Sequence, residues 1–310
     1  MPKPNPSGIS KWTPAELSDL SGRLYLITGG NSGIGLEAAK ILARQNADVV
    51  IAARNPGKGA AALAWIESLG AGKAELLQMD LADMASIRQA AAEAKDRFGI
   101  ITALINNAGI MQTPKQATAD GFEMQLGTNH LGHFLWTAQM LGQLDPSEGR
   151  VVSVSSIAHK YGKLNFDDLM LEKSYDPTAS YTQSKLANLV FALELHRRLK
   201  AAGSPIKSIG CHPGYSDTEL QSTGPFGLFK GVYKITNALF AQGADLGSYP
   251  TVLAAADPRA VSGGYYGPTG AFDTRGPVGD ADIASRTLNE EVGARLWQMS
   301  EELVGEKLEV

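Results

Sequence analysis

The sequence predicts an α/β fold, with one doubly wound, mostly parallel sheet of seven strands and helices on both faces. Short apolar runs alternate with longer amphipathic runs along most of the 310 residues, which indicates βαβ units and a parallel sheet. No internal repeat or clear linker interrupts this alternation. A glycine-rich turn joins the first run to the second, and right-handed crossovers place helices on both faces.

The predicted elements are strands where the runs are short and apolar, and helices where apolar residues repeat about every 3.6 positions. We expect strands over residues 24–27, 48–53, 75–79, 101–105, 151–154 and 206–211, and a short last strand within 263–270. We expect helices over residues 34–44, 59–69, 86–98, 122–144, 179–202 and 290–302, followed by a frayed tail over 303–310.

Chain length and composition limit the domain organisation. At roughly 150 residues per domain the length suggests about two domains, but the unbroken alternation favours one over residues 21–310. Residues 1–20 are expected to form a Pro-rich N-terminal extension with a short helix after Thr13-Pro14. The balance of 28 Lys and Arg against 32 Asp and Glu residues argues against a nucleic-acid partner.

Targeting and redox features also restrict the class of protein. The N-terminus lacks the apolar core of a secretory signal, and no apolar stretch reaches the ~18 residues that a membrane span needs. The single cysteine, Cys211, excludes an intrachain disulfide and suits a reducing compartment. We expect it to be a buried small apolar residue. The sequence therefore predicts a cytoplasmic protein without a membrane span.

The glycine-rich turn has the features of a phosphate-binding loop. Gly29 turns the chain at the end of the first strand, Gly33 lets the backbone approach a pyrophosphate, and Gly35 allows close helix packing. Asn31 and Ser32 add side-chain donors. The helix N-terminus offers N–H groups and the positive end of its dipole to the phosphates. An ordinary αβ turn is the alternative, and the strand–turn–helix context disfavours it.

The spacing T-G-x-x-x-G-I-G over residues 28–35 resembles the short-chain dehydrogenases/reductases of the classical type. Further motifs in matching order extend this resemblance from about residue 21 to about residue 218. The resemblance implies a single Rossmann domain that binds a nicotinamide nucleotide. The cofactor would contact the turn at Gly29, Asn31, Ser32, Gly33, Ile34 and Gly35.

The end of the second strand favours NADP(H) over NAD(H). A NAD site usually has an acidic residue there, whereas this chain has Ala53 followed by Arg54. A planar guanidinium binds a 2′-phosphate that a carboxylate would repel. Arg54 is therefore the main candidate for binding the 2′-phosphate, and Lys58 is a weaker one. The alternative is that Arg54 is only a solvent-exposed residue of a loop.

Two further strand ends resemble cofactor contacts of the family. Asp80-Leu81 matches its adenine contact, with Asp80 near the exocyclic amine. The N-N-A-G element, partly structural in the family, corresponds to Asn106, Asn107, Ala108 and Gly109. Neither asparagine is therefore assigned a catalytic role.

Tyr181 and Lys185 form the central catalytic candidate. A separation of four places them on one helix face. A phenol with a reference pKa of about 10 is a poor acid or base at neutral pH, and a nearby ammonium lowers that pKa. The pair thus supplies a general acid for a carbonyl oxygen, or a base for an alcohol. A surface pair is the alternative, and the order of the motifs disfavours it.

The resemblance adds a serine and an asparagine to the predicted catalytic set. Ser156 would hydrogen-bond the substrate oxygen, with Ser155 as the alternative. Asn129 would hold a local distortion of its helix and, through it, a water molecule linked to Lys185. Lys185 would also bind the nicotinamide ribose. The spacing of His130 and His133 suggests a metal, but nothing nearby completes a ligand set, so no metal is expected.

The segment between the serine and the tyrosine is long, as in the retinol-dehydrogenase-like branch. It carries His159, which we expect to be exposed in a loop, although it could reach the mouth of the site. Pro213-Gly214 resembles the turn over the nicotinamide, and Thr218 the carboxamide contact. Residues 215–242 resemble a lid, and their apolar side chains suit a lipophilic carbonyl or alcohol; ordinary core packing is the alternative.

These features predict an NADP(H)-dependent oxidoreductase that transfers a hydride between nicotinamide C4 and a carbonyl or alcohol carbon. A non-catalytic NADP(H)-binding sensor or scaffold is the alternative, and the complete Asn129, Ser156, Tyr181 and Lys185 set disfavours it. Light-driven C=C reduction is a further alternative that a single cysteine disfavours. The sequence leaves the oligomeric state open, with a homodimer or a homotetramer as candidates, because the family's helices that match 122–144 and 179–202 form dimer faces in many relatives.

Overall fold

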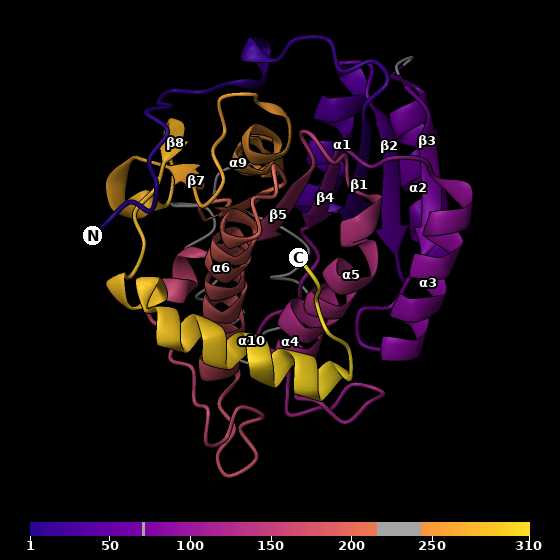
Figure 1. Ribbon diagram of the computed structural model, residues 1–310. Coiled ribbons are helices and arrows are strands. Elements are labelled where there is room, and N and C mark those ends of the chain that lie inside the picture. Colours follow the sequence, from indigo (N-terminus) through magenta and orange to yellow (C-terminus); the bar gives the residue numbers. More distant parts are fainter. Residues whose placement is uncertain (70–71, 216–242) are drawn as a thin grey trace.

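The computed structural model describes residues 1–69, 72–215 and 243–310, and its centre is one open sheet (Figure 1). The strand order is β3-β2-β1-β4-β5-β6-β7-β8, in which β8 alone runs antiparallel to its neighbour. The strands are β1 (Leu24–Thr28), β2 (Asp48–Ala53), β3 (Ala74–Gln78), β4 (Ala103–Asn106), β5 (Arg150–Val154), β6 (Lys207–Cys211), β7 (Tyr265–Pro268) and β8 (Val278–Asp280).

The predicted α/β class and its mostly parallel sheet are confirmed, but the predicted number of seven strands is wrong for the described residues. The eighth strand, β8, has three residues and pairs with β7 through Tyr266, Gly267 and Pro268. Its sequence, V-G-D, is too short to show the alternation by which a strand is recognised. Only its partner in the sheet makes it a strand.

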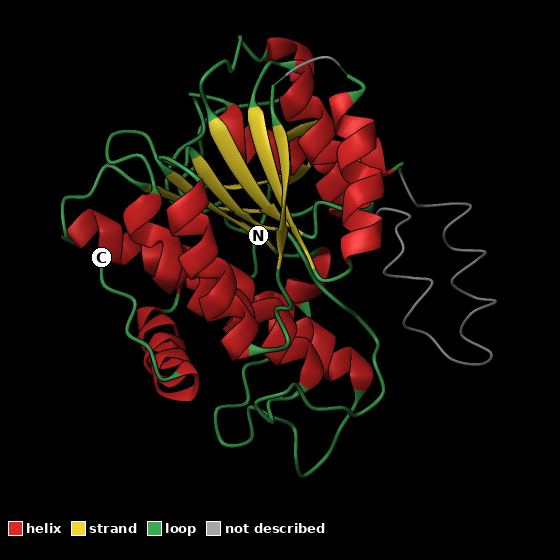
Figure 2. Ribbon diagram, turned by 90° about the vertical axis from the view of Figure 1, so that its right-hand side faces the viewer, coloured by secondary structure: helices red, strands yellow, loops and turns green. Residues whose placement is uncertain are grey.

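Helices cover both faces of the sheet (Figure 2). One face carries α1 (Gly33–Arg44), α2 (Pro56–Glu67) and α9 (Ala244–Ala256), and the other carries α3 (Met84–Arg97), α5 (Gly132–Met140) and α6 (Pro177–Ala201). Alternate residues of β1 serve the two cores, with Tyr25 and Ile27 in the first and Leu26 in the second. This period of two is the geometry of a strand buried on both faces.

The single helix predicted over 122–144 is divided in the structure. A short α4 (Met124–Leu126) leads into a π turn over Gly127–Leu131, and α5 and a 3-10 turn (Leu141–Gln143) follow. The N–H of Gly132 donates to Gly127 O, five residues back. Apolar periodicity does not show such a bulge, because the extra residue shifts the spacing by only one position.

The two chain ends pack on the domain. Trp12 is buried, and its indole N–H donates to Asp257 at 2.7 Å. The carboxylate of Asp280 accepts the N–H groups of Ser7 at 3.0 Å and Gly8 at 2.7 Å. Residues 1–20, expected as an extension, therefore lie against β8 and α9. Their contacts involve residues more than 200 positions away in the sequence.

The predicted frayed tail over 303–310 is wrong. Leu308 is buried, and its N–H donates to Glu301 at 3.1 Å. The guanidinium of Arg88 donates to Val304 O at 2.7 Å. The tail continues α10 (Glu290–Val304) and is fixed against α3, which composition alone does not reveal.

Helix α10 packs across α5 and α6 through an aromatic cluster. The Trp297 ring lies 5.3 Å from Phe134 and 5.9 Å from Phe191, between ring centroids, with the Arg198 guanidinium 4.3 Å from its centroid. Part of the α5 and α6 surface is thus covered by this chain's own α10. No helix within the described ranges is long and apolar enough to cross a bilayer.

Replacing Trp297 with alanine should lower the free energy of unfolding by about 3–5 kcal/mol, because the buried ring leaves a cavity between α5, α6 and α10. Urea unfolding at neutral pH measures this change. The matched control is Trp65→Ala, since Trp65 is 49% exposed and its contact with the Lys40 ammonium, 3.6 Å from the ring centroid, contributes about 1–2 kcal/mol. Equal losses in the two variants would contradict the packing described for α10.

Candidate active site

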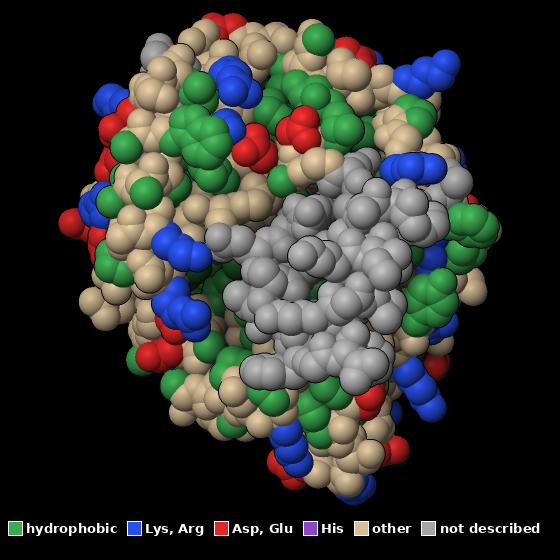
Figure 3. All heavy atoms as spheres, turned by 180° about the vertical axis from the view of Figure 1, so that it is seen from behind, with side chains coloured by type: hydrophobic (Ala, Val, Ile, Leu, Met, Phe, Trp, Pro, Cys, Tyr) green, Lys and Arg blue, Asp and Glu red, His purple; other side chains and the backbone are tan. Residues whose placement is uncertain are grey.

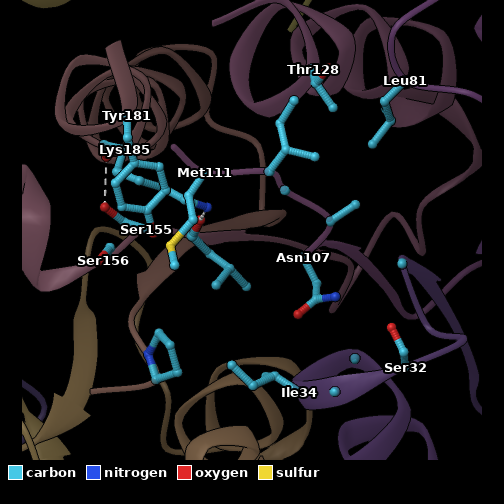
Figure 4. A pocket seen from close by; sticks show the side chains of 18 of the residues that line it. Ser32, Ile34, Leu81, Asn107, Met111, Thr128, Ser155, Ser156, Tyr181 and Lys185 are labelled. Atoms are coloured by element: carbon cyan, nitrogen blue, oxygen red, sulfur yellow. Dashed lines mark hydrogen bonds between the residues drawn. The ribbon is translucent and has the colours of Figure 1, made fainter. Parts of the chain in front are cut away.

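A cavity of about 760 Å³ lies at the carboxyl ends of the parallel strands. In open α/β sheets, ligands bind in the crevice outside the carboxyl ends of the strands. The cavity brings together nearly all the predicted site residues: Gly29, Asn31, Ser32, Gly33, Ile34, Gly35, Arg54, Lys58, Asp80, Leu81, Asn107, Ala108, Gly109, Ser155, Ser156, Tyr181, Lys185, Pro213 and Gly214. Figure 4 shows Ser32 and Ile34 at one end and Tyr181, Lys185 and Ser156 at the other.

The glycine-rich turn is tightly packed against the end of β4. Gly29 has φ +67°, and a Cβ there would lie 3.0 Å from Ala108 Cβ. A Cβ at Gly35 would lie 2.5 Å from Gly29 O, so helix α1 approaches the turn at a distance only glycine permits. The Ser32 side chain makes no capping bond to α1. The first-turn amides of α1 are therefore available to phosphate oxygens, and the turn fits a dinucleotide pyrophosphate.

Thr28, which the sequence analysis did not select, joins this turn to the rest of the site. Its Oγ1 accepts the N–H groups of Asn107 and Ala108, both at 3.0 Å. With both lone pairs used, its O–H donates to His133 Nε2 at 2.8 Å. His133 Nδ1–H then donates to Asn129 O at 2.9 Å. A chain of hydrogen bonds thus runs from β1 to the π turn.

Asn129 lies behind the cavity wall and does not line it. Its carboxamide accepts the N–H of Ile110 at 2.8 Å and donates to Ile110 O and Ser184 Oγ, both at 2.9 Å. The π turn around Asn129 is the helix distortion that the resemblance implied. His130 bonds Ser300 at 2.9 Å, and burial lowers the pKa of His133 to about 4. His130 and His133 are thus both buried and hydrogen-bonded to groups of the protein.

Tyr181 and Lys185 come from one face of α6 and border the cavity. Lys185 Nζ donates to Val154 O, at the end of β5, at 3.2 Å. The ammonium is buried, and desolvation lowers its pKa from 10.5 to about 8. A Cβ at Gly109 would lie 3.2 Å from this nitrogen, so the glycine leaves room for the lysine head group.

The two adjacent serines have different geometries. Ser155 is buried, and its O–H donates to Lys185 O at 2.7 Å (Figure 4). Ser156 is partly exposed, and its Oγ accepts the N–H of Ala158 at 3.2 Å. Because Ser156 Oγ accepts that bond, its hydrogen can donate to an oxygen in the cavity. The geometry thus favours Ser156 over Ser155 as the substrate-facing hydroxyl.

Comparisons with known proteins agree with this site. The family model described as "short chain dehydrogenase" matches residues 23–224. Human "Retinol dehydrogenase 13" is 38% identical over 298 residues, covering 92% of this chain and 86% of the relative. The chain belongs to the short-chain dehydrogenase family. Its curated relatives place it in the retinol-dehydrogenase-like branch.

Solved structures of similar chains have the same fold. The crystal structure of a putative uncharacterized protein from Mycobacterium paratuberculosis has TM-score 0.81 and 39% identity, and the match covers 96% of this chain and 99% of that one. A short-chain dehydrogenase from Burkholderia cenocepacia J2315 in complex with NADP has TM-score 0.64 and 26% identity, and covers 80% and 96% of the two chains. This dehydrogenase is therefore an oxidoreductase with a Rossmann-like domain.

One prediction about the dehydrogenase site is wrong, and others lie outside the described residues. His159, expected in an exposed loop, is fully buried beneath the Ser156 turn, because it bonds β7 and the segment after β8. Thr218 and the lid residues after Tyr215 lie outside the described ranges. Cys211 is buried as predicted, and burial raises the pKa of its thiol to about 12.

Several cavity residues of the dehydrogenase were not predicted. Met111 and Gln112 follow the N-N-A-G element, and Ile157 and Tyr161 follow the serine pair. In Figure 4, Met111 points toward the end of the cavity that carries Tyr181. The only sequence signal for these cavity residues is that they follow the recognised motifs along the chain. The chain brings them to the wall only because β4 and β5 are neighbours in the sheet.

The buried Lys185 of the dehydrogenase should reduce its stability at neutral pH. Below pH 8 the lysine is charged in both the folded and the unfolded state, and the folded state bears the full free-energy cost of desolvating the ammonium. Between pH 8 and 10.5 the folded state has lost a proton that the unfolded state keeps, so stability rises with pH. The cofactor-free Lys185→Met variant should therefore be more stable than wild type at pH 7 by on the order of 2–3 kcal/mol.

This advantage of Lys185→Met should shrink as the pH rises from 8 to 10.5. Urea unfolding at pH 7 and pH 10 measures it. Lys95→Met, at an exposed lysine, is the control and should show no such change. A difference between Lys185→Met and wild type that is the same at both pH values would show that the ammonium is not desolvated.

Proposed function

We propose that this chain is an NADP(H)-dependent oxidoreductase that interconverts a lipophilic carbonyl compound and its alcohol. The observation that carries the proposal is the joint placement of Tyr181, Lys185 and Ser156 at one end of a cavity whose other end is a glycine-rich phosphate turn. A bound NADPH supplies the hydride, which the carbonyl carbon accepts.

The residues of the chain handle the proton and orient the substrate. Tyr181 donates its phenolic proton to the carbonyl oxygen, or accepts a proton in the alcohol direction. Lys185 lowers the pKa of that phenol by its charge and holds the nicotinamide ribose. Ser156 donates to the substrate oxygen and fixes it beside Tyr181. Asn129 hydrogen-bonds both backbone groups of Ile110 and so fixes the segment next to the Lys185 head group.

The preference for NADP(H) rests on Arg54. Its side chain is 76% exposed at the end of β2, and its Nη1 lies 3.8 Å from Asp80 Oδ2. It borders the cavity together with Lys58, while Ala53 leaves no carboxylate to repel a phosphate. The complex of the Burkholderia relative with NADP supports this preference. By the family resemblance, Asp80 and Leu81 would contact the adenine, and Pro213 and Gly214 the nicotinamide. Thr218, which lies outside the described residues, would contact the carboxamide.

A lipophilic substrate suits the wall next to Tyr181. Met111 lies toward Tyr181 (Figure 4), and Met124, Ile157 and Tyr161 also line the cavity and add apolar surface to it. The retinol dehydrogenase relative is named for a substrate of this kind. We also propose that residues 215–242 form a lid over the substrate, although 216–242 lie outside the described ranges. The proposal also includes a cytoplasmic location and a homodimer or homotetramer, whose contacts would have to lie beside α10.

On the side opposite to that in Figure 1, the visible described surface carries charged side chains of both signs (Figure 3). Lys and Arg side chains are interspersed with Asp and Glu there, and apolar side chains lie between them (Figure 3). Both signs of charge are thus mixed on the described part of this face.

Tyr181→Phe should reduce kcat for carbonyl reduction by roughly 10²–10⁴-fold, because the general acid is lost, while NADPH still binds. NADPH consumption over a panel of lipophilic aldehydes and ketones measures turnover, and NADPH fluorescence titration measures binding. Tyr249→Phe, a tyrosine of α9 that packs on Trp12, is the control. A wild-type protein that binds NADPH but reduces no carbonyl would favour the sensor or scaffold alternative.

Arg54→Ala should weaken NADPH binding by about tenfold or more, as expected for a lost charge-assisted hydrogen bond to phosphate. NADH binding should stay as in wild type, because NADH lacks the 2′-phosphate. Arg44→Ala, on an exposed arginine of α1, controls for net charge. If the ratio of the two dissociation constants stays unchanged in Arg54→Ala, the basis for NADP(H) preference is lost.

A further inference from the structure

The turn after β5 holds a buried histidine that the mechanism above does not use. His159 belongs to the 3-10 turn Ile157–Lys160, which begins directly after Ser156. Its ring is fully buried, and the Tyr265 ring packs edge-on against it at 5.4 Å between centroids. A buried polar ring beside a substrate-facing serine calls for a physical reason.

The hydrogen bonds of His159 define its tautomer. The N–H of Ala284 donates to Nε2 at 3.3 Å, so Nε2 carries a lone pair. Ser156 O lies 2.6 Å from Nδ1, and a carbonyl oxygen only accepts, so Nδ1 carries the hydrogen. The Tyr265 hydroxyl, 3.4 Å from Nδ1, is compatible with this arrangement as a second acceptor. The ring is therefore neutral, with Nδ1–H donating to the serine carbonyl.

The Ser156 peptide is thus fixed from two sides. Its carbonyl accepts the backbone N–H of His159 at 3.0 Å as well as Nδ1–H, and its Oγ accepts the N–H of Ala158. Arg286 donates to His159 O at 3.2 Å. Residues 284–286 therefore anchor the turn from a segment 125 positions further along the chain.

We propose that His159 is a positioning residue for Ser156: its neutral Nδ1–H tautomer, set by the Ala284 N–H, holds the serine peptide so that the hydroxyl points at the substrate oxygen. The kinetic part of this inference rests on the proposed function, since it needs Ser156 to contact the substrate. The tautomer and the contact to Ser156 O do not depend on it.

Two variants separate the two nitrogens. In His159→Asn the side-chain amide N–H can replace Nδ1–H and keep the donor to Ser156 O. In His159→Gln the amide oxygen can replace Nε2 and keep the acceptor for Ala284, but the side-chain donor to Ser156 O is lost and only the backbone N–H of residue 159 remains. We expect His159→Gln to lower kcat by roughly tenfold to a hundredfold, as a displaced catalytic group does, and His159→Asn to restore a large share of that loss. NADPH affinity should not change in either variant.

A double-mutant cycle with Ser156→Ala distinguishes positioning from general structural support. If His159 acts through the serine hydroxyl, His159→Gln should cause no further loss of kcat in the Ser156→Ala background. Losses that multiply would overturn the proposal. His196→Gln is the matched control, because His196 lies at the far end of α6, bonds Ser262 at 2.8 Å and does not line the cavity.

Nitrogen NMR of protein with ¹⁵N-labelled histidine tests the tautomer without turnover, with the His159 signals assigned by their absence in His159→Asn. We expect a protonated Nδ1 and an unprotonated Nε2 at neutral pH. A protonated Nε2, or a doubly protonated ring, would overturn the proposal even if carbonyl reduction is observed. If no carbonyl is reduced but the expected tautomer is found, the proposed function fails and the contact to Ser156 stands.

Discussion

The hydroxyl of Thr28 is the point on which the geometry of the site depends. It stands at the end of β1, accepts two N–H groups from the end of β4 and donates to His133, which in turn bonds the π turn. One side chain thus fixes the glycine-rich turn, the N-N-A-G segment and the helix distortion relative to one another. Buried, fully satisfied networks of this kind specify one arrangement, because every alternative leaves a polar group unpaired.

The same network explains why a lysine can be buried beside the cavity. The π turn directs the Asn129 carboxamide to both polar groups of Ile110 and so shapes the strand end that lines the lysine pocket. Gly109 leaves space for the ammonium, and Val154 O accepts from it. The desolvation that lowers the pKa of Lys185 reduces the stability of the fold. Functional sites commonly retain such a cost because the chemistry needs the charge.

Much of the fold was predictable because it follows from local spacing. The strand over residues 48–53 has the predicted bounds, and the other predicted strands and helices occur with ends shifted by a few residues, except for the region 122–144. That region is interrupted where Gly132 packs on Leu81 O, a contact between distant segments. Strand β8, helix α9 and the fixed C-terminal tail were missed, since short or evenly apolar segments carry no clear period.

The sequence by itself determined the parallel sheet, the glycine-rich turn and the placement of Tyr181 and Lys185 on one helix face, because each depends on residues close together in the chain. Only the tertiary structure decided the different hydrogen bonds of Ser155 and Ser156, the burial of His159, and the packing of α10 across α6. Each of these depends on contacts such as the one between His159 and Ala284, 125 positions apart. Spacing along the chain carries no information about such distant partners until the sheet order brings them together.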